Sequence, residues 1–422
     1  MDRALVAERI KGAGWRSLQT GFLSLAIGLI GPAAIAGTQF AAAMLLWHAV
    51  SPGEFGLFSF AILLVQLSFG LSNALFGTPL SVALRGPGWS AVHHGCLSIH
   101  GLFLGLIGLA VPLALWLTGG SANLAGFALL AVTANLRWAA RSCAIAREKV
   151  AISARADCAY AAIALGLLGL AMVCGRLSLG PVIYSLVAAN VAVTLVFNRE
   201  FLGRQFAALL HPDFKLYAHD IWPNQVRWSL AGVLTTEASG NAHGYLVTGF
   251  AGAASFAPLA FASLFCRPMT IFLGAITQTD RPVFARLIGE KDAARLTALL
   301  QRSYVSAGLI WLGNAIMAAL ALQLFSPQIA ARGYDMDVVR TAIISWFAIT
   351  ALRGARNPLA TLLQARGAFR LLAVCSLGSA LVSVAAVGWF VAIDPAHSLV
   401  GIVAGELVLM LGILLASRTL AR

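Results

Sequence analysis

The run AASFAPLAFASLFCRPMTIFLGAITQT at residues 253–279 is long enough to cross a membrane, and it carries one arginine, Arg267, near its middle. A helix needs about 20 apolar residues to span the hydrocarbon core of a bilayer. A charge held in hydrocarbon is unfavourable by several kcal/mol unless it finds water or a partner. We therefore expect Arg267 to lie in a water-filled cavity, beside a counter-charge or against an anionic ligand.

The composition of the whole chain agrees with this local pattern. Of the 422 residues, 59% are hydrophobic and only 11% are charged, whereas about a quarter of the residues in an ordinary soluble domain are charged. The apolar runs are long and show no two-residue alternation, which favours helices over a membrane barrel. These features predict an all-α integral membrane protein.

Apolar runs recur twelve times along the chain, and each is long enough to form a transmembrane helix. The expected spans lie near residues 19–47, 54–82, 95–118, 121–143, 155–174, 178–198, 227–249, 253–279, 302–325, 339–364, 368–392 and 398–417. The longest polar segment follows the sixth run. We therefore predict an N-terminal six-helix bundle at residues 1–198, a cytoplasmic segment at 199–225 and a C-terminal six-helix bundle at 226–422.

The positions of the basic residues predict the orientation of these spans. With a cytoplasmic N-terminus, only Arg176, Arg332 and Arg340 fall in the external loops, and Arg267 lies within a span. The other 25 of the 29 lysines and arginines fall on the cytoplasmic side, as the positive-inside rule requires. Orientation rather than nucleic-acid binding thus explains the net charge of +13, and both termini are expected in the cytoplasm.

Short sequence matches relate the two halves of the chain. The segment Trp15-Arg-Ser-Leu18 precedes the first span, and Arg227-Trp-Ser-Leu230 begins the seventh. Leu136-Arg137 in the fourth span matches Leu352-Arg353 in the tenth. Six spans per half make the two repeats parallel, and transporters place a substrate path between such repeats. We therefore expect twelve transmembrane helices in two six-helix repeats around a central cavity.

Three segments resemble those of bacterial polysaccharide flippases. They are Ser51-Pro-Gly-Glu-Phe-Gly-Leu-Phe-Ser-Phe-Ala61 at the second span, Arg281-Pro-Val-Phe-Ala-Arg-Leu-Ile-Gly-Glu290 after the eighth and Leu362-Leu-Gln-Ala-Arg-Gly367 near the tenth. The chain therefore resembles the polysaccharide-transport branch of the multidrug/oligosaccharidyl-lipid/polysaccharide exporter superfamily over essentially its whole length. The resemblance implies a multi-pass protein of the bacterial inner membrane that moves undecaprenyl-pyrophosphate-linked oligosaccharide to the periplasmic leaflet. It also implies membrane lipids and other polysaccharide-assembly membrane proteins as partners.

Arg267 and Glu237 are the strongest candidates for substrate contact. Glu237 lies in the seventh span at a depth comparable to that of Arg267, and Asn241 follows it by one helical turn on the same face. Two interpretations stay open. Either the two charges neutralise one another, or Arg267 binds pyrophosphate or an acidic sugar while Glu237 holds it between substrates or binds a coupling cation. Pro258 and Pro268 predict a bend in the eighth span.

The first two spans contribute only neutral polar candidates, Gln39 and Asn73. Related lipid II flippases carry several arginines there, so this departure argues against a peptidoglycan precursor as substrate. In the last span, Glu406 is expected to face a partner helix or to bind a cation. Arg353 and Arg356, about one turn apart in the tenth span, are expected to reach toward headgroups or to contact an anion near the inner end.

Two other functions are consistent with the sequence. A multidrug or toxic-compound exporter of the same superfamily favours cationic drugs and an acidic cavity, for which Glu237 is the candidate. A membrane polysaccharide polymerase or ligase has a similar composition but a sizeable external loop, and the external loops here are short. The chain has no G-x-x-x-x-G-K-[ST] run and no C-x-x-C pair, so we expect no bound nucleotide, cofactor or metal. We therefore predict a transporter rather than an enzyme.

Overall fold

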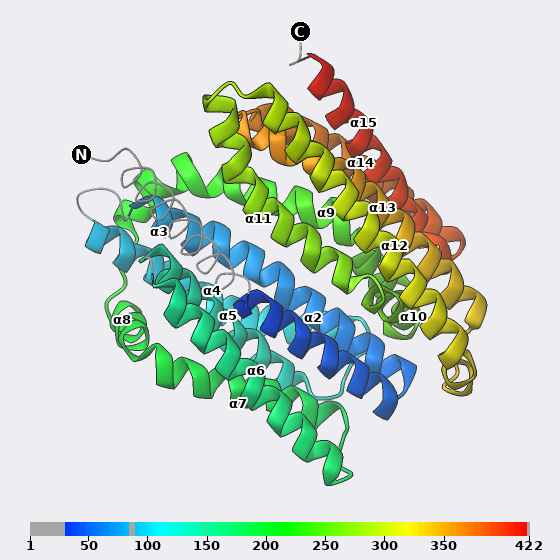
Figure 1. Ribbon diagram of the computed structural model, residues 1–422. Coiled ribbons are helices and arrows are strands. Elements are labelled where there is room, and N and C mark those ends of the chain that lie inside the picture. The colour runs from blue at the N-terminus through cyan, green and yellow to red at the C-terminus, as the bar shows by residue number, and fades with distance from the viewer. Residues whose placement is uncertain (1–29, 84–88, 148, 420–422) are drawn as a thin grey trace, which may run out of the picture.

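The computed structural model describes residues 30–83, 89–147 and 149–419, and within these ranges every regular element is a helix (Figure 1). The first half contains the helix Ile30–Ala49, α2 (Pro52–Ser72), α3 (Thr78–Ala83), α4 (Trp89–Leu117), α5 (Leu124–Ala146), α6 (Val150–Val173) and α7 (Leu179–Phe197). After α8 (Arg199–Leu210), the second half contains α9 (Arg227–Ala251), α10 (Ala253–Leu264), α11 (Arg267–Gly289), α12 (Ala293–Ala331), α13 (Met336–Ala365), α14 (Phe369–Ile393) and α15 (Ser398–Thr419).

Twelve helical passes result from these elements. Helices α2 and α3 form one pass through the π-helical turn Asn73–Gly77, and α10 and α11 form another. In the described part of the chain, nine helices are long and apolar enough to span a membrane, or ten if α10 and α11 count as one span. The two remaining passes, α5 and α9, are long enough but carry the charged residues discussed below. Each predicted span corresponds to one pass, although the first begins outside the described residues.

Helix α2 begins where the sequence supplies a complete cap. The Ser51 hydroxyl accepts a hydrogen bond from the backbone N–H of Glu54 at 3.3 Å, and the Glu54 carboxylate accepts one from the backbone N–H of Ser51 at 3.2 Å. This reciprocal pair satisfies two N–H groups that have no partner within the helix. Pro52 occupies the first turn, where its missing N–H costs nothing. The cap therefore allows the short turn between the helix Ile30–Ala49 and α2.

The predicted bend in the eighth span is present between α10 and α11, whose axes differ by 59°. Pro268 is the second residue of α11, a position at which proline removes no intrahelical hydrogen bond. Pro258 instead lies inside α10. Because the chain leaves the helical path just before Arg267, this arginine becomes the first residue of a new helix near the middle of the span.

The segment between the two halves is helical and attached to the first half. On α8, Gln205 is buried, and its side-chain oxygen lies 3.0 Å from Nδ1 of His100 on α4. The π-helical segment Tyr217–Val226 then leads directly into α9. The Tyr217 hydroxyl donates to the backbone carbonyl of Leu75 at 2.7 Å, and burial raises the pKa of this hydroxyl. The polar segment is therefore a packed connection rather than a loose linker.

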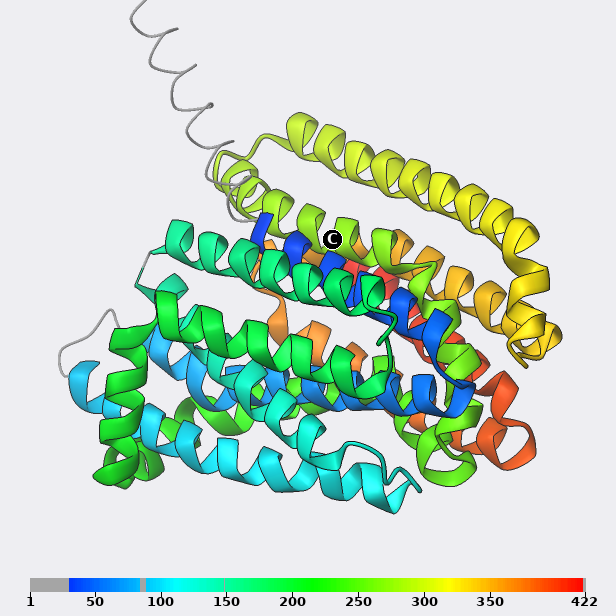
Figure 2. The same cartoon turned by 90° about the horizontal axis from the view of Figure 1, so that it is seen from below.

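The two halves lie side by side, and α2 forms much of the contact by packing on α10 and α9 (Figure 1). At Gly56 of α2, a Cβ atom would overlap the backbone carbonyl of Ala253 at the start of α10. In the same region Trp47 stacks on Phe261, with ring centroids 4.6 Å apart. We call this end of the molecule the closed end, and the opposite end, where α8 lies, the α8 end. Helix α12 is the outermost helix of the second half and packs mainly on α11 and α13 (Figure 2).

Candidate functional site

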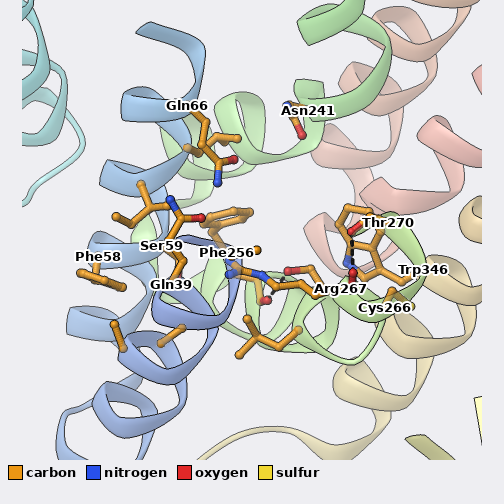
Figure 3. Close-up of a pocket in the computed structure, with 18 of the residues that line it drawn as sticks. Gln39, Phe58, Ser59, Gln66, Asn241, Phe256, Cys266, Arg267, Thr270 and Trp346 are labelled. Atoms are coloured by element: carbon orange, nitrogen blue, oxygen red, sulfur yellow. Dashed lines mark hydrogen bonds between the residues drawn. The ribbon is translucent and has the colours of Figure 1, made fainter. Parts of the chain in front are cut away.

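A cavity of about 310 Å³ lies between the two halves at the bend of the eighth span (Figure 3). The helix Ile30–Ala49 and α2 form most of one wall, and α9, α10, α11 and α13 form the other. Toward the closed end the lining is buried, since Ala42, Ala43 and Phe58 are 0%, 5% and 2% exposed. Toward the α8 end, Gln66 and Thr270 are exposed. The cavity is therefore covered at the closed end and accessible from the α8 end.

Arg267 lies in the wall of this cavity and is half-buried. Its side chain extends from the start of α11 toward the helices that carry Gln39 and Ser59 (Figure 3). Among the described residues, none forms an ion pair with Arg267 or accepts a hydrogen bond from its guanidinium group. A half-buried guanidinium without a partner is a strong site for an anion, because it remains charged at any physiological pH.

Neutral amides complete the polar part of the lining. Gln39 and Asn241, both predicted from the sequence, line the cavity together with Arg267. Gln66 and Ser59 of α2 also line it and were missed by the sequence analysis. Gln66 interrupts the apolar run of α2, so the argument that singled out Gln39 in the preceding helix applies equally to Gln66.

Glu237 does not pair with Arg267. Its carboxylate accepts a hydrogen bond from Nδ2 of Asn241 at 2.8 Å and another from the Tyr245 hydroxyl at 2.9 Å. Glu237 is absent from the cavity lining, although Asn241 links it to that lining. The neutralising ion pair that the sequence left open is thus not formed. Among the described residues, no group of three His, Cys, Asp or Glu side chains is arranged to hold a metal ion.

Asn73 is not brought to the cavity. It lies at the start of the π-helical turn that joins α2 to α3, and its side chain is exposed. Its side-chain oxygen lies close to Gly77, where a Cβ atom would overlap it. Asn73 thus belongs to the irregular turn of this span rather than to the cavity. On α2 the last lining residue is Gln66, two turns before Asn73.

Arg353 is a second cation in the cavity wall, and a buried carboxylate holds it. Glu406 of α15 is 3% exposed, and it accepts a hydrogen bond from Nε of Arg353 at 2.6 Å and from Nε of Arg356 at 2.8 Å. The guanidinium of Arg353 lies against α9, where a Cβ atom at Gly240 would be 3.4 Å from its Nη2. One carboxylate shared by two guanidinium groups leaves this cluster with a formal charge of +1, adjacent to the cavity.

The first half contains a similar buried cluster outside the cavity. Asp157 of α6 accepts hydrogen bonds at 2.8 Å from Nη1 of Arg137 and from Nε of Arg141, both on α5. Arg137 also donates to Asn190 of α7 at 2.7 Å and lies over the Tyr160 ring, 4.2 Å from its centroid. Helices α5 and α13 are the fourth passes of their halves. The predicted match between the arginines of the fourth and tenth spans thus holds in that both lie in the fourth pass of their half and bind a buried carboxylate. The carboxylates are not equivalent, because Asp157 belongs to the fifth pass of the first half and Glu406 to the sixth pass of the second.

His243 lies in the cavity wall but is packed among aromatic rings. It is 3% exposed, and its ring makes an edge contact with Trp346, with centroids 5.3 Å apart. Phe256 lies on another side, with its centroid 6.0 Å away. Its Nδ1 atom is buried and has no hydrogen-bond partner among the described residues. The ring therefore acts as part of the aromatic wall between α9, α10 and α13.

Comparisons with known proteins identify the fold. No protein-family model matches the chain, and no curated protein matches it in sequence. An inward-facing multidrug resistance MATE family transporter of the MOP superfamily matches with a TM-score of 0.63 and 15% identity, over 91% of this chain and 94% of that chain. An outward-facing MATE transporter matches with a TM-score of 0.57 and 16% identity, over 94% of each chain. A MOP superfamily transporter from Pyrococcus furiosus, described with a binding pocket of reversed polarity, gives the same three values.

This likeness shows that the chain has the MATE-like transporter fold, with twelve transmembrane helices in two repeats. The predicted fold class is thus confirmed. The TM-score is higher for the inward-facing structure than for the outward-facing one.

Proposed function

We propose that this protein moves an anionic, lipid-linked oligosaccharide across the bacterial inner membrane by alternating access, for polysaccharide biosynthesis. The MATE-like fold supports transport, because paired six-helix repeats open a central cavity to each side of the membrane in turn. One observation carries the choice of an anion. The guanidinium of Arg267 has no ion-pair partner among the described residues, and it lies in a cavity whose described lining contains no carboxylate.

The chemistry of the lining fits an undecaprenyl-pyrophosphate headgroup. A guanidinium group binds phosphate oxygens through two parallel N–H donors and stays charged throughout. Arg353, held by Glu406, adds a second cation to the same wall. The attraction is stronger than in bulk water, because the surrounding helices lower the effective dielectric constant. The headgroup would enter from the α8 end while the polyprenyl tail stays in the lipid.

Export of cationic drugs is the second candidate function. It is favoured by the likeness to multidrug resistance MATE transporters and by Glu237. The Glu237 carboxylate does not line the cavity, but it accepts a hydrogen bond from Asn241, which does. A cationic drug would have to displace Asn241 and Tyr245 from Glu237 and would meet Arg267 in the same cavity. Electrostatic repulsion from Arg267 therefore disfavours this candidate.

A polymerase or ligase is a weaker alternative. The solved structures that share this fold are transporters, and a fold alone does not specify chemistry. Among the described residues, the cavity contains cations, amides and aromatic rings, but it lacks a carboxylate that could act as a general base. This lining suits binding and release better than glycosyl transfer.

The test is transbilayer movement of a fluorescent undecaprenyl-pyrophosphate oligosaccharide in reconstituted vesicles. Wild type is expected to move the probe, and Arg267→Ala is expected to reduce the rate by about tenfold or more. Arg267→Lys should keep part of the activity, because lysine retains the charge but lacks the planar pair of N–H donors of arginine. The matched control is Arg286→Ala on the same helix, because Arg286 is 68% exposed at its side chain and, among the described residues, forms its ion pair with the exposed Glu290 at 3.9 Å.

The same vesicles separate the two transport functions. Failure of wild type to move the lipid-linked probe, combined with export of a cationic dye that depends on Glu237, would overturn the proposal in favour of the drug exporter. Equal loss of activity in Arg267→Ala and Arg286→Ala would remove the specific role of Arg267.

A further inference from the structure

The two walls of the cavity carry different chemistry. The first half contributes the side chains of Gln39, Ser59 and Gln66 as its polar groups, and none of its described lining residues is charged. The second half contributes both cations, Arg267 and Arg353. It also contributes the neutral polar side chains of Asn241, Ser263 and Thr270, each of which already donates a hydrogen bond within its own helix. The division follows the boundary between the two halves, which are the bodies that move relative to one another in alternating access.

Each wall suits a different part of a lipid-linked sugar. An amide offers two N–H donors and a carbonyl acceptor, and a hydroxyl both donates and accepts. These groups match the hydroxyls of a neutral sugar, which also donate and accept. A guanidinium offers donors and a positive charge, and it matches phosphate oxygens, which only accept. A negative charge on the ligand would not strengthen its binding to the amide and hydroxyl groups of the first half. The same charge would strengthen its binding to the arginines of the second half.

We propose that the second half binds the anionic group of the transported lipid, while the first half recognises its uncharged, hydroxyl-bearing sugar through Gln39, Ser59 and Gln66. This inference rests on the proposed function. Charge-assisted hydrogen bonds are stronger than neutral ones, so the substrate remains with the second half when the halves separate. The neutral contacts break first. The polar side chains of the first half therefore select the sugar but do not prevent its release.

Binding of two defined lipids to the full-length protein in nanodiscs tests the division. One probe is undecaprenyl pyrophosphate, and the other is the same lipid carrying a neutral disaccharide. Arg267→Gln is expected to weaken both probes by a similar factor of about ten or more. The double variant Gln39→Leu with Gln66→Leu is expected to weaken only the disaccharide lipid, by about tenfold for two lost hydrogen bonds.

The control is Gln323→Leu on α12, outside the cavity lining, which should leave both affinities unchanged. Size-exclusion profiles and thermal unfolding of each variant confirm that it is folded. The inference is overturned if the disaccharide adds nothing to the affinity of wild type, or if the double glutamine variant weakens both lipids equally. Failure of wild type to bind either lipid would instead overturn the proposed function, so the two failures are distinguishable.

Discussion

Nη1 of Arg332 lies 3.1 Å from the backbone carbonyl oxygen of Trp47 and donates a hydrogen bond to it, which joins the second half of the protein to the first at the closed end. The guanidinium carbon of Arg332 also lies 5.7 Å from the centroid of the Trp47 ring. The Trp47 ring stacks on Phe261, and Tyr334 lies beside Phe261 with centroids 5.9 Å apart. One layer of aromatic rings and a cation therefore covers the cavity on this side.

Removal of the Arg332 guanidinium should open the closed end more often. In Arg332→Gln the hydrogen bond to Trp47 and the cation–π contact are lost, and each is worth about 1 kcal/mol. We expect a cysteine placed at Ser59, in a chain whose native cysteines are replaced, to react up to about thirtyfold faster with an impermeant thiol reagent added on the side of the closed end.

The control for this experiment is Arg340→Gln at the same end of the protein. Arg340 is 58% exposed at its side chain and pairs with the surface residue Asp337 at 3.4 Å, so its removal should not change the labelling rate. An unchanged rate in Arg332→Gln would show that the aromatic layer closes the cavity without the arginine.

Gly56 allows the close approach of α2 and α10 because it has no side chain. A Cβ atom at Gly56 would overlap the Ala253 carbonyl, whereas one at Gly53, in the same helix, would meet no atom within 4 Å. Gly56→Ala should therefore push the halves apart at the closed end and slow transport, while Gly53→Ala should not. The comparison is made by transport assays and by the solvent accessibility of Cys266, which is 1% exposed in the closed arrangement. Identical behaviour of the two alanine variants would contradict this account of the contact between α2 and α10.

The fold was predictable from the sequence because bilayer thickness sets the length of each apolar run and basic residues mark the loops. The largest difference in boundaries is at α12, which runs from Ala293 to Ala331 against a predicted 302–325. Where charge enters a span, the boundaries agree within a few residues, but the partner of the charge was not predictable. Helix α13 extends to Ala365 and contains Arg353 and Arg356, which remain inside because Glu406 neutralises part of their charge. Hydropathy is scored for each residue by itself, so it does not include the effect of Glu406 on the two arginines.

The site was predictable only in part, for a physical reason. Helical spacing alone places Asn241 one turn from Glu237, and the same rule extends to Tyr245, two turns away, whose hydroxyl also contacts Glu237. The pairing of Arg353 with Glu406 depends on packing between α13 and α15, which local spacing does not determine. The sequence left open whether Glu237 pairs with Arg267, and the pair is not formed because nearer neutral groups on α9 satisfy the carboxylate.

Glu406→Gln should destabilise the protein and alter the cavity. The substitution leaves the guanidinium groups of Arg353 and Arg356 without a carboxylate, and breaking a buried ion pair from one side costs about 3–5 kcal/mol. Unfolding in detergent should show this loss, and Arg356→Gln in the same chain should restore part of it by removing one of the two uncompensated charges. Glu290→Gln is the control, since the side chain of Glu290 is 51% exposed and its surface pair contributes little. A Glu406→Gln variant as stable as the control would show that water compensates both arginines.

Asp157→Asn should cost more than Glu406→Gln. Both carboxylates bind two arginines, but the side chain of Arg137 is 4% exposed, whereas that of Arg353 is 23% exposed beside a cavity. Water can partly replace the carboxylate for Arg353 but not for Arg137, so the variant should lie at or above the upper end of the range of about 3–5 kcal/mol for a broken buried pair. The yield of folded protein and the midpoint of detergent unfolding measure the difference. Asp337→Asn, with a side chain that is 90% exposed, is the control and should remain within about 0.5 kcal/mol of wild type. A smaller effect for Asp157→Asn than for Glu406→Gln would mean that Asn190 and the Tyr160 ring are sufficient to hold Arg137.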